Sequence, residues 1–322
     1  MRALALGIAM VLAAACGGGD DQASPPPSTV PDGTPGPPSA AELCAGVALV
    51  EPVPTVAADG LDEASGLAAS RVTPGLLWAH DDSGGDAAVY AIGPDGSDRG
   101  AWPLDGVEAF DWEDMARGPG PDGTGDLLYL GDIGDNRATR DDVTVVRAPE
   151  PSAPEAAAAG PIAGAEAVRL AYADGPRDAE ALVADPLSGD LVIVDKSLLG
   201  GSVGAYVVPA ATPWGPVGGG AEAAAVTTIE RAGDVNLGLG QIVTGADVSS
   251  DGSLVAVRTY TDVWLWDRAA GRSVPEAMAG EPCQAPAAAE QQGESVALDP
   301  DGRGYTTVSE GEHPAVNHFR LP

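Results

Sequence analysis

The sequence predicts an all-β fold, a single β-propeller with five blades, and six blades as the alternative. Three observations favour this class of fold. One sequence phrase recurs five times, a Gly-containing turn separates the two strands within a phrase, and helical periodicity is nearly absent. Each phrase consists of a short apolar strand, a turn, a second apolar strand and a polar loop. The five phrases begin at Glu63, Asp111, Asp178, Thr244 and Gln292.

Turn dipeptides and further apolar runs complete the predicted blades. The dipeptides supply the positive φ that tight hairpins need, so their flanking strands should pair antiparallel. They lie at Asp122-Gly123, Ser188-Gly189, Asp251-Gly252 and Asp301-Gly302. An apolar third strand follows each phrase, and fourth strands are expected near residues 101–104, 167–170, 225–229 and 273–274. We expect residues 47–50 to supply the fourth strand of the last blade and so close the ring. A sixth blade would have to lie within residues 210–240.

The N-terminal residues predict export and a lipid anchor. Met1 and Arg2 precede an apolar run over residues 3–15 that has the pattern of a secretory signal and is too short to span a bilayer. The run ends at Cys16 and resembles a bacterial lipobox, in which the cysteine is acylated. Leu12, however, lies four residues before Cys16 instead of the usual three. A soluble secreted protein is the alternative.

The chain divides into three parts. Residues 1–16 are the expected signal and anchor, and residues 17–41 are a low-complexity stretch rich in Pro and Gly that we expect to be a disordered linker. Residues 42–322 form the expected propeller domain, which we predict to be monomeric. Cys44 and Cys283 are expected to form a disulfide near the closure of the ring, because exported thiols oxidise; two free thiols are the alternative.

The net charge of −32, from 48 acids and 16 bases, limits the classes of binding partner that can be expected. Nucleic acid and anionic headgroups need clustered cations, so neither is an expected partner, and contact with a membrane is expected through the lipid anchor alone. The acidic balance favours cations as ligands, or simply a well-solvated surface.

The predicted fold brings two rings of residues to one face. The start of each innermost strand and the end of the next strand open around the central channel. The first ring is Ser65, Glu113, Glu180, Ala246 and Glu294, with Asp247 displaced by one position. The second is Asp81, Asp132, Lys196, Thr259 and Glu310, preceded in three blades by His80, Asp195 and Arg258.

Crowded carboxylates must be protonated, paired with cations or bound to a metal. Because acids outnumber Lys196 and Arg258, we predict a calcium site with Glu113, Glu180, Glu294 and Asp132 as ligands. Lys196, Arg258, Asp195, Asp247 and Glu310 are predicted to face the ligand. The alternative is a channel plugged by internal ion pairs.

Catalytic residues are not identified by any established motif. His80-Asp81 allows a general-base interpretation, with a capped strand end as the alternative. The loop Gly131-Asp132-Ile133-Gly134-Asp135-Asn136-Arg137 is acidic, but its spacing does not fit an EF-hand. Zinc is disfavoured, since the chain has three histidines and no cysteine cluster.

The phrases DWEDMA, LYLGDIGDNR, TGADVSSDG and GRGYTTVSEG resemble those of a group of exported bacterial propeller proteins. That resemblance implies the fold and no activity. More remotely the chain is similar to phytase-like and lactonase-like propellers, which implies calcium and hydrolysis. A phytase-type site needs several Lys and Arg side chains, which are scarce here, whereas a lactonase-type site could draw its ligands from Glu113, Glu180, Glu294 and Asn136.

Two functions follow as hypotheses. The first is a binding or scaffold module on the cell envelope that binds calcium. The second is a metal-dependent hydrolase of a small ester, lactone or phosphate, in which His80 or Asp81 activates water. Whether the protein is an enzyme stays open at this point.

Overall fold

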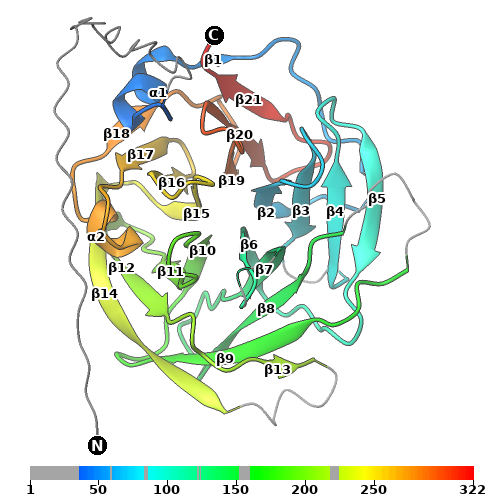
Figure 1. Ribbon diagram of the computed structural model, residues 1–322, viewed down its shortest axis with the longest axis vertical. Coiled ribbons are helices and arrows are strands. Elements are labelled where there is room, and N and C mark those ends of the chain that lie inside the picture. Colours follow the sequence, from blue (N-terminus) through cyan, green and yellow to red (C-terminus); the bar gives the residue numbers. More distant parts are fainter. Residues whose placement is uncertain are drawn as a thin grey trace, which may run out of the picture. The chain divides into compact units, whose positions relative to one another are not determined.

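Antiparallel strands follow one another around a central axis in the computed structural model (Figure 1), which describes residues 36–58, 60–82, 86–121, 123, 125–151, 160–217 and 225–322. Cys16, Asp122 and most of the expected linker lie outside these residues. Residues 37–322 form one compact unit. Within the described ranges, no helix is long and apolar enough to cross a membrane.

The described strands form three four-stranded sheets and one nine-stranded sheet, and this arrangement confirms the predicted all-β propeller. In chain order they divide into groups of four, to which the short β13 (Gly215–Pro216) is added. The first group is β2 (Ala64–Ala69), β3 (Leu77–Asp81), β4 (Ala88–Ile92) and β5 (Asp98–Pro103). The second is β6 (Trp112–Pro119), β7 (Asp126–Asp132), β8 (Val143–Pro149) and β9 (Glu166–Tyr172). The third is β10 (Ala179–Ala184), β11 (Leu191–Asp195), β12 (Gly200–Val208) and β14 (Val226–Leu239).

Two further groups complete the circle. One is β15 (Val243–Val248), β16 (Leu254–Thr259), β17 (Val263–Asp267) and β18 (Cys283–Ala285). The other is β19 (Gly293–Leu298), β20 (Gly304–Ser309), β21 (Asn317–Arg320) and the N-terminal β1 (Ala48–Leu49). β1 pairs with β21 through Ala48↔Arg320 and Leu49↔Phe319, as the sequence predicted for the closing strand.

The disulfide lies at this closure. Cys44 of helix α1 (Ala40–Gly46) is bonded to Cys283 of β18 with an S–S distance of 2.03 Å, which confirms the expected pairing. Leu43 of α1 is fully buried against the same core. The N-terminal segment is therefore held by a covalent bond, by a strand pairing and by apolar packing.

One local prediction was wrong. Residues 273–274 were expected in a strand, but they begin the short helix α2 (Val274–Met278), because Ser273 and Glu276 form a capping box. β18 takes the fourth position in that group instead. Residues 210–240 contribute β13 (Gly215–Pro216) and β14, and both join existing sheets: β14 pairs with β12 on one side and parallel with β9 on the other.

Buried aspartates tie the innermost strands together. Asp114 is fully buried, and its carboxylate accepts backbone N–H groups of Met115, Leu182 and Ala246, which belong to β6, β10 and β15. Burial raises the pKa of Asp114 well above its usual value, against these hydrogen bonds. This cross-link fixes the starts of three inner strands relative to one another, and those starts carry the candidate site.

Candidate functional site

An acid-lined cavity of about 190 Å³ lies at one end of the innermost strands. It is formed where inner strands start and second strands end, as the predicted fold requires. Its lining residues are Asp82, Glu113, Asn136, Glu180, Lys196, Tyr260, Gln292, Glu294 and Glu310. A space of this size holds several water molecules or a hydrated ion. We call it the acid mouth.

Glu113 is the most crowded carboxylate of the acid mouth. It is 5% exposed, and its oxygen atoms belong to two triples in which the three ligand atoms lie within 4.8 Å of one another. One triple adds Asp82 and Asp111, and the other adds Asp178 and Glu180. Burial, followed by the neighbouring acids, raises the pKa of Glu113 well above its usual value.

Acidic side chains surround the Glu113 carboxyl. Glu180 lies within 4.8 Å of it, and no salt bridge among the described residues involves Glu113. The Lys196 charge lowers the pKa of Glu113, but burial and the neighbouring acids outweigh that effect. Gly134 lies directly against this carboxyl, since a Cβ there would come within 2.1 Å of Glu113 Oε1 and 2.6 Å of Asp111 Oδ2. The glycine lets the loop backbone cover the carboxylates closely.

Lys196 supplies the positive charge among the residues that line the acid mouth. Its Nζ lies 2.5 Å from Glu180 Oε1 and 5.6 Å from the centroid of the Tyr260 ring. Burial works to lower the pKa of Lys196, but the Glu180 carboxylate outweighs it and the pKa is raised. Burial raises the pKa of Glu180 to about 7, against the effect of Lys196. One ammonium group neutralises only part of the negative charge.

A second pair of acids completes the lining. Glu294 accepts a hydrogen bond from Gln292 Nε2 at 2.8 Å, and Glu310 lines the same cavity. Burial raises the pKa of Glu294 to about 9 and also raises that of Glu310. Burial and mutual repulsion thus oppose ionisation of these carboxyls, and a bound cation would favour their charged form as oxygen ligands.

Asp82, Asp111 and Asp178 were missed as candidate ligands, although a sequence signal for two of them exists. Asp111 and Asp178 each stand two residues before a ring glutamate, in Asp111-Trp112-Glu113 and Asp178-Ala179-Glu180. Residues two apart on an extended chain point to the same side, so both acids of each pair face the cavity end. Asp82 follows the end of β3 by one residue, the position that Lys196 occupies after β11.

The loop after β7 covers the acid mouth. The Gly134 N–H donates to the Asp111 carbonyl at 3.2 Å, and the Asp135 N–H donates to Asp178 Oδ1 at 2.8 Å. Arg140 then braces the loop through Nη1 to the Gly134 carbonyl at 2.8 Å. Asn136 is thereby placed in the lining of the cavity.

Asp132, predicted as a metal ligand, does not line the cavity. Its Oδ1 pairs with Arg140 Nη2 at 2.7 Å and its Oδ2 accepts the Phe110 N–H at 3.0 Å. The salt bridge with Arg140 neutralises the Asp132 carboxylate, so Asp132 helps to hold the loop after β7 in place. The other three predicted ligands, Glu113, Glu180 and Glu294, are brought together with Glu310 and Lys196.

Three residues predicted to face a ligand are turned elsewhere. Asp195 accepts the Gly204 N–H at 2.7 Å and lies 3.5 Å from Arg177 Nη1. Asp247 accepts the N–H groups of Val248 and Leu298, both at 2.7 Å, so it joins β15 to β19. Arg258 is fully buried and pairs with Glu290 at 2.6 Å. Each is a structural group inside the blades.

His80 and Asp81 are likewise structural. His80 is fully buried, with its Nδ1 2.9 Å from the Asp81 carbonyl and its ring 5.2 Å from that of Trp112. Burial lowers the pKa of His80, which keeps it neutral. Asp81 Oδ1 accepts the Glu63 N–H at 2.7 Å, the capped strand end that was the alternative interpretation. Neither residue lines the acid mouth.

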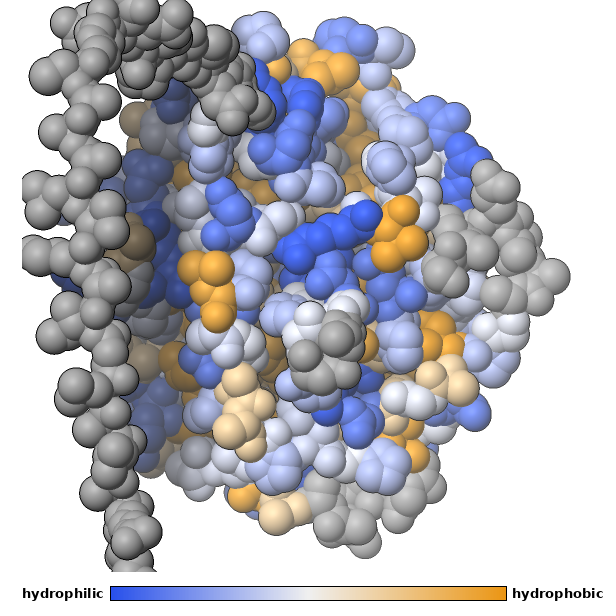
Figure 2. Space-filling view, viewed as in Figure 1, coloured by the Kyte–Doolittle hydropathy of each residue, from blue (hydrophilic) through white to orange (hydrophobic). Residues whose placement is uncertain are grey.

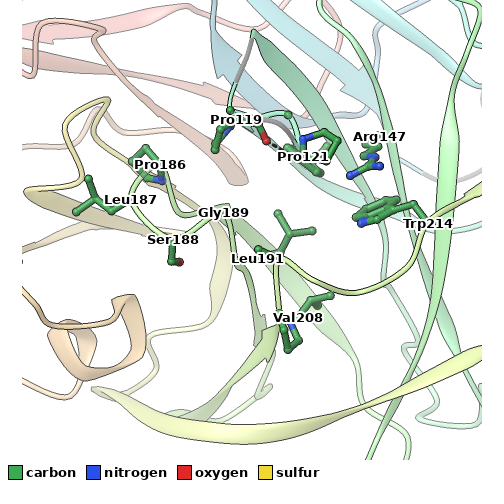
Figure 3. A pocket seen from close by; sticks show the side chains of 15 residues that line it. Pro119, Pro121, Arg147, Pro186, Leu187, Ser188, Gly189, Leu191, Val208 and Trp214 are labelled. Carbon is green, nitrogen blue, oxygen red and sulfur yellow. Dashed lines mark hydrogen bonds between the residues drawn. The ribbon is translucent and has the colours of Figure 1, made fainter. Parts of the chain in front are cut away.

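A second cavity, of about 240 Å³, lies at the other end of the strands, beside the hairpin turns (Figure 3). Pro119, Pro121 and Pro186 border it, and the Arg147 guanidinium lies 4.4 Å from the centroid of the Trp214 ring. No carboxylate is among the described residues that line it. The rest of the surface seen in Figure 2 is mostly hydrophilic, with small separate apolar patches.

Fold and site together define a β-propeller with an acid-lined cavity at one end of the innermost strands. No protein-family model matches the chain, and no curated protein matches it. The chain is similar to the crystal structure of RRP9 WD40 repeats, at 10% identity and a TM-score of 0.42, over 89% of this chain and 99% of that one. It is also similar to the crystal structure of Chaetomium thermophilum Raptor, at 10% identity and a TM-score of 0.35, over 77% of this chain and 19% of that one.

Proposed function

We propose that this protein is a binding module of the cell envelope whose acid mouth holds a divalent cation, with calcium as the preferred ion. The observation that carries the proposal is the position of Glu113. It is buried, it belongs to two triples of carboxylates, and no salt bridge among the described residues involves it. A carboxylate in that position gains most from a bound cation.

The ligand chemistry favours calcium. Calcium takes six to eight oxygen ligands at roughly 2.3–2.6 Å in a flexible geometry, so two ligands of one ion can lie up to about 5 Å apart. The carboxylate oxygens of each triple lie within 4.8 Å of one another, which is compatible with that span. The Asn136 side chain and waters in the cavity would add neutral oxygen ligands. Magnesium demands a tighter octahedron and fits this loose set less well.

Attachment to the envelope is part of the same proposal. The lipobox-like residues before Cys16 support acylation at that cysteine. The expected linker would then separate the propeller from the lipid surface. The test is the mass of the N-terminal peptide from the protein made in a bacterial host: a diacylated Cys16 supports the anchor, and an unmodified peptide cut elsewhere argues against it.

The hydrolase hypothesis is not favoured by the geometry. It required His80 or Asp81 to activate water, but the first is sealed in the core and the second is bonded to the Glu63 N–H. A metal bound in the acid mouth would therefore act as part of a binding site.

The decisive experiment is the metal content of the purified chain, measured by elemental mass spectrometry after equilibration with a mixture of calcium, magnesium and zinc. We expect stoichiometric calcium in the native protein and loss of it in Glu113→Gln. Glu281→Gln, which changes an exposed acid outside the site, is the matched control. Native protein that carries no metal, or a Glu113→Gln variant that keeps it, contradicts the cation site.

A further inference from the structure

The face that carries the acid mouth also exposes large apolar side chains. Phe110 is 68% exposed, and the exposed fractions of Leu198, Leu199 and Leu239 are 73%, 78% and 87%. Phe110 precedes Asp111 at the start of β6, the two consecutive leucines follow Lys196 after the end of β11, and Leu239 ends β14 just before β15. All four therefore stand at the end of the strands where the acid mouth opens.

Leu199 and Leu239 lie on neighbouring backbone segments, and Leu198 precedes Leu199 in the chain. Gly200 is the strand partner of Leu239, and the Gly240 N–H donates to the Leu199 carbonyl at 2.9 Å. A Cβ on Gly201 would lie 3.8 Å from Leu239 Cδ2. The backbone pairing thus places Leu199, just before β12, beside Leu239 at the end of β14. We call Leu198, Leu199 and Leu239 the leucine tip.

Phe110 lies on the other flank of the acid mouth. It lines a shallow cavity of about 340 Å³ with Asp111 and Asn136, and Asn136 also lines the acid mouth. The Arg140 guanidinium lies 4.9 Å from the centroid of the Phe110 ring and holds that side chain in place. On the leucine side, Lys196 lines the acid mouth and lies two residues before Leu198. Phe110 and the leucine tip are thus each linked to the acid mouth through a residue that lines it, Asn136 for Phe110 and Lys196 for the leucines.

Apolar side chains exposed beside a desolvated charged cavity are typical of a protein-binding surface. We propose that this face docks a segment of a partner protein that carries a lysine or arginine flanked by apolar residues. The cationic side chain enters the acid mouth beside Glu113, and its apolar neighbours cover the leucine tip and Phe110. Charge complementarity selects the partner, because the buried carboxylates exceed the single ammonium of Lys196, and the net charge of −32 speeds encounter with basic partners.

A lipid surface fits this face less well. Anionic headgroups would meet Glu113, Glu180, Glu294 and Glu310 in the centre of the contact and be repelled. An apolar anchor in a bilayer is normally accompanied by Lys and Arg, and the described rim of the cavity offers carboxylates instead.

This inference rests on the acid mouth that we propose as a cation site, and it adds the partner. A basic side chain and a calcium ion would use the same carboxylates, so each should exclude the other. Calcium is then a regulator of docking: the metal-free form takes the partner, and the calcium-loaded form releases it.

The test uses the purified full chain and three dye-labelled synthetic peptides, with arginine alternating with leucine, arginine alternating with serine, and glutamate alternating with leucine. Fluorescence anisotropy should show binding of the first peptide, weaker binding of the second and none of the third. The double variant Leu198→Ser with Leu199→Ser should bind the first peptide about tenfold more weakly and the second peptide with unchanged affinity, as expected when a docking contact is truncated. Leu187→Ser, an exposed leucine at the opposite end of the strands, is the matched control.

Each outcome decides a separate point. Equal binding of the first peptide by the native protein and the double leucine variant overturns the inference, as does binding of all three peptides alike. A different outcome is that the native protein floats with vesicles of phosphatidylcholine and phosphatidylglycerol while the double leucine variant does not. That result would show that the leucine tip binds lipid, and it would overturn the proposal of a protein partner. If the protein binds calcium but no peptide, this inference fails and the proposed cation site stands. If it binds the peptide but no calcium, the docking surface stands and the proposed cation site fails.

Discussion

Lys196 Nζ lies 2.5 Å from Glu180 Oε1, and this is the ion pair within the acid mouth. The side chains are 9% and 4% exposed, so the pair is shielded from water. Among the described residues, no salt bridge involves Glu113 or Glu294, and burial raises the pKa of both. The charge imbalance at the mouth is thus built into the fold.

Removal of Lys196 should show how much the pair stabilises the protein. We expect Lys196→Met to lower the free energy of unfolding by about 3–5 kcal/mol near pH 8, because an uncompensated buried carboxylate remains. The loss should shrink near pH 5, where Glu180 takes a proton. Urea denaturation at the two pH values measures both. Arg272→Met, which breaks an exposed pair with Glu276, should cost about 0.5 kcal/mol or less.

The metal-free protein should lose stability as the pH rises from about 4.5 to about 9. The pKa of Glu180 is raised to about 7 and that of Glu294 to about 9, from an ordinary value of 4.5. In this window the folded protein keeps protons that the unfolded chain has released, so unfolding becomes easier with each step in pH. The slope is about 1.4 kcal/mol per pH unit for each proton retained. Thermal melts in chelator should show the decline, and Glu294→Gln should flatten its upper part; a curve that rises with pH in the variant and native protein alike would refute it.

Asp114 should be among the most sensitive positions in the fold. Asp114→Ala removes the acceptor of three backbone N–H groups and leaves them buried, so we expect a loss of about 3 kcal/mol or more. Asp114→Asn keeps one acceptor oxygen and should cost less. Chemical denaturation of the two variants gives the order, and equal stability of Asp114→Ala and the native protein would show that the cross-link between strands is unimportant.

The disulfide should stabilise the closed ring. Replacement of both Cys44 and Cys283 by serine should lower the free energy of unfolding by about 2–5 kcal/mol, because the bond constrains the unfolded chain. The native protein should show the same loss in reductant, and the double variant should be insensitive to reductant. A melting temperature that the reductant shifts equally in both proteins would contradict this.

The sequence was sufficient for the fold because the signals are local. Turn dipeptides such as Asp251-Gly252 and the repeated apolar strands specify hairpins directly, and β1 could be assigned to the last group since that group lacked a strand. The failure at residues 273–274 was also local: the capping box of Ser273 and Glu276 was present in the sequence and was overlooked.

The site was predictable only in part. The first ring follows from the repeat, so Glu113, Glu180 and Glu294 could be expected to converge. The sequence could not show which residues of the second ring face the cavity, because the orientation of a charged side chain depends on partners far away in sequence. Arg258 is neutralised by Glu290, and Asp132 by Arg140, and neither pairing has a sequence signature.

The most direct test of the central claim is a calcium titration of the melting temperature at pH 8, with Glu113→Gln measured beside the native protein. If a cation binds at Glu113, the melting temperature should rise with calcium in the native protein, to about the extent that mass action allows, and should not change in the variant. A native protein whose melting temperature does not change with calcium, or a variant that responds as the native protein does, would contradict a cation site at Glu113. The acidic side chains would then only fill the end of the inner strands.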